Sequence, residues 1–433
     1  MAERERIIEL DRRHVWRPYT STDDHMAVDP MVIVGARGAW LEDADGTQYL
    51  DANGSWWCNN LGHGHPRLLE ALRRQSEQLA HCSLAGITHE PAALLARELA
   101  EVAPEGLARV FYSDDGSTAV EVALKMALQY WRQNGRPQRT RFVTLSGAYH
   151  GDTSGAMSVG GMDTFRKTYE PMLFEPVRAP APEDGDAGWT RVAEEVEAIL
   201  RREGDTIAGV VVEPLVQGVA GMRIHPPEVL RHLREATRRS DTFLLADEVF
   251  TGFGRTGAMW ACDRAGVAPD LLCTAKGLSG GVLPFAATLA SERVFDGFRG
   301  GKDRALMHGH TFCGNPLAAT VAREVLAIYR DEDVLGQVRA RAPRIARTFE
   351  HLGTLPGARN PRAIGMIGAV DLGTSGYLGR TGWAVYEAAR RRGAYLRPLG
   401  DTVYICPALT IADGDLDRLL DIVEASVREV VAE

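Results

Sequence analysis

The sequence predicts an α/β fold in two parts: a large domain built on a mostly parallel central sheet, and a smaller α+β domain formed by the two termini. Short apolar runs alternate with helical patterns in the middle of the chain, which is typical of repeated strand–helix units. Near residues 331–333 this alternation gives way to a long helical pattern and then to short, glycine-punctuated strands. Residues 1–60 also contain strand-like pieces.

Five short apolar runs are expected to form the parallel sheet, because each is followed closely by Gly, Asp or Pro. They cover residues 109–113, 141–145, 209–213, 242–246 and 271–275. A helix is expected over residues 117–131, where the apolar side chains fall on one stripe. Thr118 and Glu121 have the spacing of a capping box at its start.

Domain boundaries are expected near residues 60 and 330. Residues 1–60 would pack with the small domain, 61–330 would form the large domain, and 331–433 would form the C-terminal small domain. In the last of these, helices are expected to end near residue 352 and to cover residues 415–431. Residues 179–188 are rich in Pro, Asp and Gly and predict a surface loop.

Composition excludes several classes of protein. The chain has 433 residues, 45% of them hydrophobic, and a formal net charge of −9 without a Lys/Arg block, which disfavours nucleic-acid and anionic-membrane partners. No stretch reaches the roughly 18 apolar residues that span a bilayer, and the N-terminus has no apolar signal core. The six cysteines are scattered and form no C-x-x-C pair, unlike a disulfide framework or zinc site. We therefore expect a soluble, cytoplasmic protein.

Two polar residues stand at the ends of predicted strands: Lys276 follows the run 271–275, and Asp247 follows the run 242–246. Strand C-termini form one edge of an α/β sheet, where ligands bind. Burial would lower the lysine pKa and favour the neutral amine, which forms Schiff bases. Pyridoxal phosphate requires such a lysine for its aldehyde and a carboxylate for its ring nitrogen. A surface lysine and a capping carboxylate remain the simpler interpretations, and Glu248 is an alternative inward-facing acid.

Further candidates accompany this pair. Gly116 and Ser117 begin a helix, whose free N–H groups and positive dipole end suit a phosphate, or are capped in the ordinary way. Tyr149 follows a predicted strand and would bring an aromatic ring to the same edge. Trp56 lies in a Gly/Asn-rich loop, as core or as pocket wall. Arg397 suits bidentate binding of a carboxylate, or is a surface cation.

Two other motifs point to different chemistry. Residues 252–257 match the G-x-G-x-x-G pattern of dinucleotide sites, but two acids precede them and the following helical pattern is short. His308 and His310 resemble a metal-ligand pair without a third ligand, so no metal site is expected. A non-enzymatic binding protein on this fold would lose the lysine, whereas Lys276 is present.

Several longer segments carry a resemblance that covers essentially the whole chain. They include HVWRPYTS, NGSWWCNNLGHGHP, LLADEVFTGFGRTG, PDLLCTAKGLSGG and HGHTFCGNPLA. With these segments the chain resembles the class III, fold-type-I pyridoxal-phosphate aminotransferases. The resemblance implies a homodimer with shared active sites and pyridoxal 5′-phosphate held as a Schiff base on Lys276.

The resemblance also implies the roles of individual residues. Lys276 would shuttle the proton, Asp247 would pair with the pyridinium nitrogen, and the cofactor phosphate would be bound by Gly116 and Ser117 and, from the partner subunit, by His310 and Thr311. The remaining implied roles concern the substrate. Tyr149 would pack near the cofactor ring and the substrate, Tyr19 and Trp56 would form walls of the pocket, and Arg397 would bind the carboxylate of the acceptor. Gly309, Asp152 and Arg255 would line the pocket.

Within this family, the chain resembles the branch that aminates 8-amino-7-oxononanoate to 7,8-diaminononanoate in biotin synthesis. Phe312, the pair Asn315-Pro316 and the pair Trp56-Trp57 favour S-adenosylmethionine as the amino donor. His310, in place of the usual Pro, and the segments FYSDDGS and GGVLP depart from that type, and the two segments resemble the variant that uses lysine. A lysine donor and a broader amine:pyruvate transaminase are the alternatives.

Overall fold

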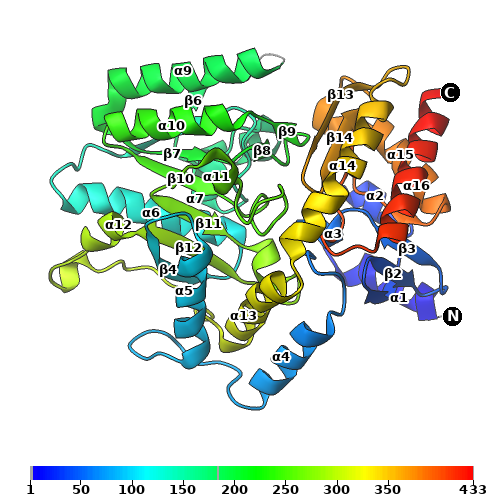
Figure 1. Ribbon diagram of the computed structural model, residues 1–433, viewed down its shortest axis with the longest axis horizontal. Helices are drawn as coiled ribbons and strands as arrows, with labels where there is room; N and C mark the ends of the chain where they lie inside the picture. Colours follow the sequence, from blue (N-terminus) through cyan, green and yellow to red (C-terminus); the bar gives the residue numbers. More distant parts are fainter. Residues whose placement is uncertain (1–2, 183–184, 433) are drawn as a thin grey trace.

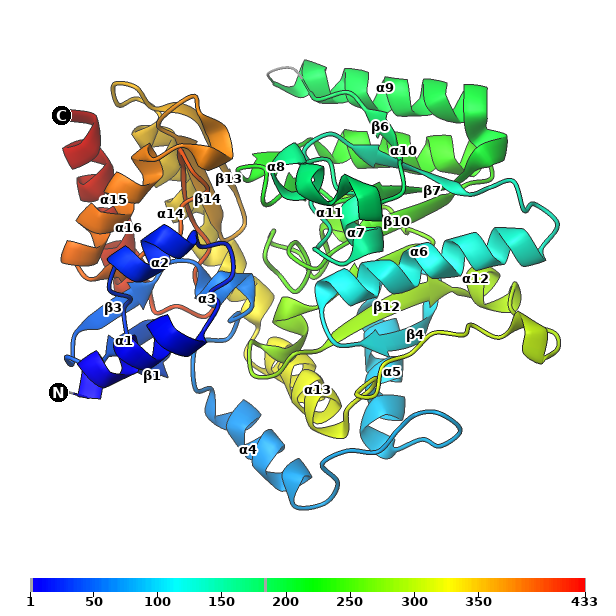
Figure 2. The same cartoon turned by 180° about the vertical axis from the view of Figure 1, so that it is seen from behind.

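The computed structural model describes residues 3–182 and 185–432, and its centre is a seven-stranded sheet of order β4-β12-β11-β10-β7-β5-β6 (Figures 1 and 2). The strands are β4 (Leu107–Ser113), β5 (Arg141–Leu145), β6 (Val177–Ala179), β7 (Ile207–Val212), β10 (Phe243–Asp247), β11 (Leu271–Thr274) and β12 (Ala286–Ser291). β12 runs antiparallel to both of its neighbours, whereas β11, β10, β7, β5 and β6 pair in parallel. The predicted α/β fold with a mostly parallel sheet is confirmed.

Helices cover both faces of this sheet. α6 (Gly116–Gln133) lies on the face seen in Figure 2, where Phe243 and Leu245 of β10 pack with it. The other face packs against α5 (Glu90–Val102), α9 (Asp186–Glu203), α10 (Pro227–Arg239) and α13 (Pro316–Asp331), with Leu244 and Ala246 pointing toward them. Burial on both faces explains why β10 reads as a continuous apolar run.

The start of α6 corrects one expectation. Asp115 is the N-cap: its carboxylate accepts the Thr118 N–H at 2.9 Å, and Thr118 Oγ1 accepts the Asp115 N–H at 3.0 Å. The predicted box between Thr118 and Glu121 is therefore wrong, because a better capping acid stands three residues earlier. Glu121 instead accepts the backbone N–H groups of Gly155 and Ala156 at 2.5 and 3.3 Å.

The second part of the molecule is built from both ends of the chain, coloured blue and orange to red in Figure 1. One sheet contains β1 (Ile33–Arg37), β2 (Trp40–Asp43), β3 (Gln48–Asp51) and β15 (Ala394–Tyr395), and the other contains β13 (Arg359–Ile364), β14 (Ile367–Asp371) and β16 (Thr402–Ile405). β15 pairs in parallel with β3 and thereby joins the two ends of the chain. From this pairing we propose domain boundaries at residues 60/61 and 330/331.

Helices complete this second part. α14 (Val334–Leu352) and α16 (Asp413–Ala432) lie close to the ranges expected from the sequence, and α15 (Thr381–Arg391) packs beside α16. The remaining helices and strands of the two parts are α1 (Glu3–His14), α2 (Thr22–Ala27), α3 (Gly54–Trp57), α4 (Pro66–Ser76), α7 (Ser154–Ser158), α8 (Asp163–Arg166), α11 (Ala261–Ala265), α12 (Glu292–Asp296), β8 (Val216–Gln217) and β9 (Arg223–Ile224).

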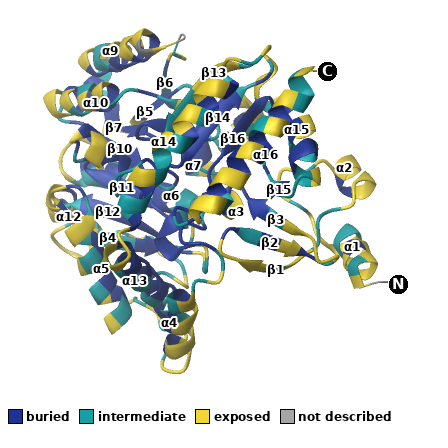
Figure 3. Ribbon diagram, turned by 45° about the vertical axis from the view of Figure 1, so that its right-hand side comes forward, coloured by how far each residue is buried: buried dark blue, intermediate teal, exposed yellow. Residues whose placement is uncertain are grey.

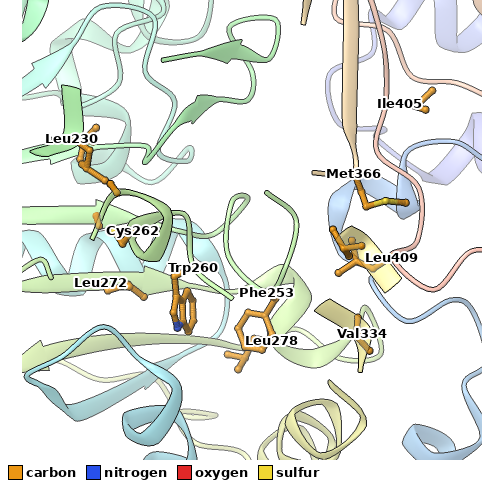
Figure 4. Close-up of a cluster of buried hydrophobic side chains, with 14 of the residues drawn as sticks. Leu230, Phe253, Trp260, Cys262, Leu272, Leu278, Val334, Met366, Ile405 and Leu409 are labelled. Carbon is orange, nitrogen blue, oxygen red and sulfur yellow. The ribbon is translucent and has the colours of Figure 1, made fainter. Parts of the chain in front are cut away.

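One connected set of buried apolar side chains runs through both parts, as the dark blue interior of Figure 3 shows. In the close-up of Figure 4, Leu272 and Trp260 belong to the large sheet region, whereas Met366 and Leu409 belong to the terminal part. Leu278 packs in the same cluster, two residues beyond Lys276. The backbone at Lys276 is therefore part of a buried segment.

The connection between β6 and α9 contains part of the surface loop predicted over residues 179–188. β6 ends at Ala179 and α9 begins at Asp186, and residues 183–184 of the predicted loop lie outside the described residues. Across residues 3–182 and 185–432, the structure contains no helix that is long and apolar enough to span a bilayer.

Candidate active site

A cavity of about 730 Å³ lies where strands β5, β7, β10 and β11 end. Ligands of α/β proteins bind at this edge of the sheet. The structure brings five of the predicted site residues to this cavity: Gly116, Ser117, Tyr149, Asp247 and Lys276. Asp152 lines it as well.

Lys276 enters the cavity directly after β11, at the start of a 3₁₀ turn over Lys276–Ser279. Its backbone has φ +45°, a conformation that is strained for a lysine and is held by the buried segment around it. The Nζ atom lies 5.4 Å from the centre of the Trp57 ring. Burial lowers the pKa of Lys276, although the charge of Asp247 opposes this shift. A larger neutral fraction makes the amine a better nucleophile and base.

The question of which acid faces the cavity is resolved by the alternation of side chains along β10. Asp247 lines the cavity, and its Oδ1 accepts the Val249 N–H at 3.1 Å. Glu248 points the other way and accepts hydrogen bonds from the N–H groups of Ala261 and Cys262 at 3.1 and 2.7 Å. Burial raises the pKa of Glu248 to about 7.

The same bonds weaken the dinucleotide interpretation of residues 252–257. The helix that follows them, α11, has five residues, and the carboxylate of Glu248 already occupies its first N–H groups. A bound pyrophosphate needs a helix N-terminus with free N–H groups.

Two functional candidates were not predicted: His150 and Glu213. The Nδ1 atom of His150 lies 2.7 Å from Asp247 Oδ2, and Glu213 accepts the N–H groups of Tyr149 and Gly218 at 3.0 and 2.9 Å. Burial lowers the pKa of His150, but the hydrogen bond and charge of Asp247 outweigh burial and raise it. His150 therefore favours the imidazolium form, which stabilises the Asp247 carboxylate. Burial raises the pKa of Glu213 to about 7, against the charge of His150.

The sequence contained a signal for one of these two residues. Glu213 directly follows the apolar strand β7, as Asp247 closes β10. The contact between His150 and Asp247 joins the loop after β5 to the end of β10, 97 positions along the chain, so no local sequence pattern predicts it.

The start of α6 forms a close-fitting cradle. A Cβ atom on Gly116 would lie 2.5 Å from Val249 Cγ1, and one on Gly151 would lie 2.3 Å from Ser117 Oγ. Only glycine therefore allows these backbone segments to approach so closely. The first N–H groups of an 18-residue helix lack partners within the helix and attract an anion. This cradle suits a phosphate group.

Beyond the cavity lies an aromatic wall. The rings of Tyr19 and Trp56 are 5.5 Å apart, and the Tyr19 hydroxyl lies 3.0 Å from that of Tyr149 and donates to Asp152. Burial and the hydrogen bond to Asp152 raise the pKa of Tyr19 to about 12. Phe165 packs against both tyrosines and was not predicted as part of the site.

Arg397 adjoins this wall. Its guanidinium carbon lies 5.1 Å from the Trp56 ring and 5.5 Å from the Trp383 ring. Within residues 3–182 and 185–432 the structure contains no ion pair or hydrogen bond of the Arg397 side chain, so its five N–H donors can bind a carboxylate.

The remaining predicted residues lie elsewhere in the single chain. Gly309, His310 and Thr311 belong to a largely exposed segment that does not line the cavity, and His310 Nδ1 lies 3.1 Å from Asp114. Arg255 is buried behind the cavity and donates to the carbonyl of Pro407 at 2.6 Å. Within the described part of the chain, no cluster of three or more His, Cys, Asp or Glu could hold a metal ion.

The cavity therefore combines three groups: a glycine-lined phosphate cradle, a lysine with a lowered pKa, and a buried carboxylate in contact with the imidazole of His150. Together they fit the phosphate, aldehyde and ring nitrogen of pyridoxal phosphate. The Arg397 guanidinium beside Trp56 adds a place for a substrate carboxylate.

Known proteins match the whole chain. The model of class-III aminotransferases matches residues 20–427. An adenosylmethionine-8-amino-7-oxononanoate aminotransferase of Nitratidesulfovibrio vulgaris is 44% identical over 98% of this chain and 81% of its own length. The crystal structure of the enzyme of that name from Methanocaldococcus jannaschii has a TM-score of 0.95 and 32% identity over 99% of both chains. A PLP-bound amine transaminase from an uncultivated Pseudomonas species has a TM-score of 0.91 and 32% identity over 96% of this chain and 98% of its own. These matches confirm the resemblance, and the chain belongs to the class-III aminotransferase family.

Proposed function

We propose that this protein is a pyridoxal-phosphate-dependent transaminase that converts 8-amino-7-oxononanoate to 7,8-diaminononanoate in biotin biosynthesis, with S-adenosylmethionine as amino donor. The similar proteins from N. vulgaris and M. jannaschii carry the name of that reaction. The observation that carries the proposal is the convergence of Lys276 and Asp247 in one cavity, with the unpaired guanidinium of Arg397 beyond it.

The cofactor is pyridoxal 5′-phosphate, which when bound supplies an electron-accepting ring that stabilises the charge left after a substrate carbon loses a proton. Lys276 Nζ would hold it covalently, and Asp247 would keep a proton on the ring nitrogen. The N–H groups of Gly116 and Ser117 would bind the phosphate. Tyr149, whose backbone is fixed by Glu213, would pack near the ring and the substrate.

The proton chemistry belongs to Lys276. Burial lowers the pKa of Lys276 and so increases the neutral fraction of Nζ, which would accept a proton from the donor carbon and return it to a carbon of the cofactor. Asp247 Oδ2 lies 2.7 Å from His150 Nδ1, so the buried carboxylate that would face the ring nitrogen has a hydrogen-bonding partner behind it.

Substrate recognition would rest on the rim of the cavity. Arg397 would bind the carboxylate of the acceptor, and the rings of Tyr19 and Trp56 would pack against its aliphatic chain. Donor and acceptor would occupy the cavity in turn, as a ping-pong reaction requires, and the anchoring by Arg397 would serve the acceptor.

The site would be completed by a second copy of the chain. Gly309, His310 and Thr311 would approach the cofactor and substrate from the partner subunit of a homodimer. The same segment exposes large apolar side chains, with Met307 84% and Phe312 58% exposed, which supports its burial in a subunit interface. All six cysteines are free, which supports location in the reducing cytoplasm.

An assay of product formation tests the proposed function. The purified protein is loaded with pyridoxal phosphate and incubated with 8-amino-7-oxononanoate and S-adenosylmethionine, and the product is identified by mass spectrometry. We expect 7,8-diaminononanoate, and none with Lys276→Ala, which should still bind the cofactor non-covalently. Transamination by the Lys276→Ala variant would refute the assignment. Product formed only when lysine replaces S-adenosylmethionine would favour the alternative donor.

A further inference from the structure

Tyr19 reaches the active site from a short segment, here called the strap, that consists of residues 15–21 and links α1 to α2. In Figure 2, α1 and α2 lie on the terminal part of the molecule, on the side facing the viewer. Tyr19 has φ +51°, in the left-handed region that is unfavourable for a tyrosine. A strained residue persists only where its surroundings hold it. The side chain is also 46% exposed, so packing around Tyr19 is only part of what holds it.

One carboxylate ties the strap to both of its flanking helices. Asp11 Oδ2, on α1, accepts a hydrogen bond from Arg17 in the strap and lies 2.9 Å from His25 Nε2 on α2. The side chain of His25 is 9% exposed, and those of Arg17 and Asp11 are 21% and 23% exposed. The hydrogen bond of Arg17 holds the pKa of Asp11 below its usual value, against the effect of burial.

We call the contacts of Asp11 with Arg17 and His25 the clasp. A second ion pair near the strap is weaker because it is exposed to water. Arg12 pairs with Asp29 at 2.7 Å, but the two side chains are 29% and 50% exposed. Exposed ion pairs contribute about 0–1 kcal/mol. Asp11 is therefore the better shielded of the two groups that fix the path of the chain on either side of Tyr19.

We propose that Asp11, together with Arg17 and His25, is a positioning group that holds Tyr19 in the wall of the substrate pocket. The inference rests on the proposed function, because it takes Tyr19 to contact the substrate. None of the three residues lines the cavity, so they would act on the reaction only through the strap. Losing the clasp would let the Tyr19 hydroxyl leave Tyr149 and Asp152, while the cofactor cradle stayed intact.

A double-mutant cycle in the holoenzyme tests this role. Asp11→Asn, Tyr19→Ala and the double variant are compared in kcat and KM for 8-amino-7-oxononanoate. Glu9→Gln is the matched control, since Glu9 is on the same helix and pairs with exposed Arg13 at 3.5 Å. We expect Asp11→Asn to lower kcat/KM about ten- to hundredfold, because a misplacement of about 1 Å can cost about a hundredfold in rate. Cofactor content should be unchanged, and Asp11→Asn should cause no further loss in the Tyr19→Ala background.

Amide hydrogen exchange gives a readout that does not depend on activity. Residues 15–21 should exchange faster in Asp11→Asn than in the wild type or in Glu9→Gln. Arg17→Gln should show the same pattern and replaces Asp11→Asn if that variant does not fold. Unchanged exchange, or an equal loss of kcat/KM with and without Tyr19, would overturn the inference. A wild-type enzyme that exchanges as expected but does not aminate the oxononanoate would instead overturn the proposed function.

Discussion

At the scale of single residues, the central group is the amine of Lys276, whose pKa is lowered by burial. Only the neutral amine attacks an aldehyde, so the rate of cofactor capture rises as the pH passes the pKa of the amine. We expect the cofactor-stripped enzyme to reach half its maximal capture rate at a lower pH than Nα-acetyl-lysine in the same buffers. The measurement is the initial absorbance change on mixing with pyridoxal phosphate. Coincident curves would show that the site does not depress the lysine pKa.

Arg397 gives a second prediction at this scale. Loss of a charge-assisted hydrogen bond costs about 1.5–3 kcal/mol, so Arg397→Ala should raise the KM for the oxononanoate by one to two orders of magnitude. The KM for the donor should change far less. Arg418→Ala is the matched control. The Arg418 guanidinium carbon lies 5.1 Å from the centre of the Trp40 ring, and Arg418 does not line the cavity. Equal effects on acceptor and donor would argue against the anchoring role.

Residue patterns predicted much of this site and missed some of it. Asp247 and Lys276 were found because each follows a buried strand, and Glu213 could have been found by the same rule. His150 and Phe165 could not be found by this rule, because their roles depend on contacts between residues far apart in the sequence. The orientation of Asp247 relative to Glu248 also required the register of β10 within the sheet.

At the scale of elements, the approach of α6 to the loop after β10 is the feature that forms the phosphate cradle. Gly116→Ala would place a methyl group against Val249, and overpacking costs about 1–3 kcal/mol. We expect the dissociation constant of pyridoxal phosphate to rise about tenfold, measured by titration of the stripped enzyme. Gly414→Ala, where nothing lies within 4 Å of the added atom, should leave it unchanged.

The same variant allows a steric rescue. Adding Val249→Ala to Gly116→Ala removes the two atoms nearest to the new methyl group, Cγ1 and Cγ2, and leaves Cβ at 3.3 Å, so the double variant should regain most of the affinity. No effect of Gly116→Ala, or no recovery in the double variant, would contradict the cradle.

Prediction of elements from the sequence succeeded where the strands carry bulky apolar side chains. The five predicted strands match β4, β5, β7, β10 and β11 with shifts of at most a few residues at the ends. β12 was missed because its sequence, AATLAS, is rich in alanine and lacks β-branched residues apart from one Thr. Its antiparallel direction is set by the pairing with β4 and β11, which local pattern does not specify.

At the scale of the whole molecule, the proposed sharing of active sites predicts complementation between inactive variants. Lys276→Ala and Thr311→Ala place their defects in different subunits of a shared site. In a mixed dimer, one site would carry both defects and the other would be intact, so random mixing should restore about a quarter of the wild-type activity. The activity of refolded mixtures measures this directly. Mixtures as inactive as the separate variants would show that the segment around Thr311 serves its own subunit.

The most direct test of the whole account is a single half-reaction. The holoenzyme is mixed with S-adenosylmethionine without any acceptor, and the visible spectrum of the bound cofactor is recorded before and after. Our account predicts conversion of the cofactor from its aldehyde form to its amine form, with reversal when 8-amino-7-oxononanoate is added. A spectrum that stays unchanged with S-adenosylmethionine but converts with lysine would contradict the proposed donor, and one that converts with neither would contradict the proposed reaction.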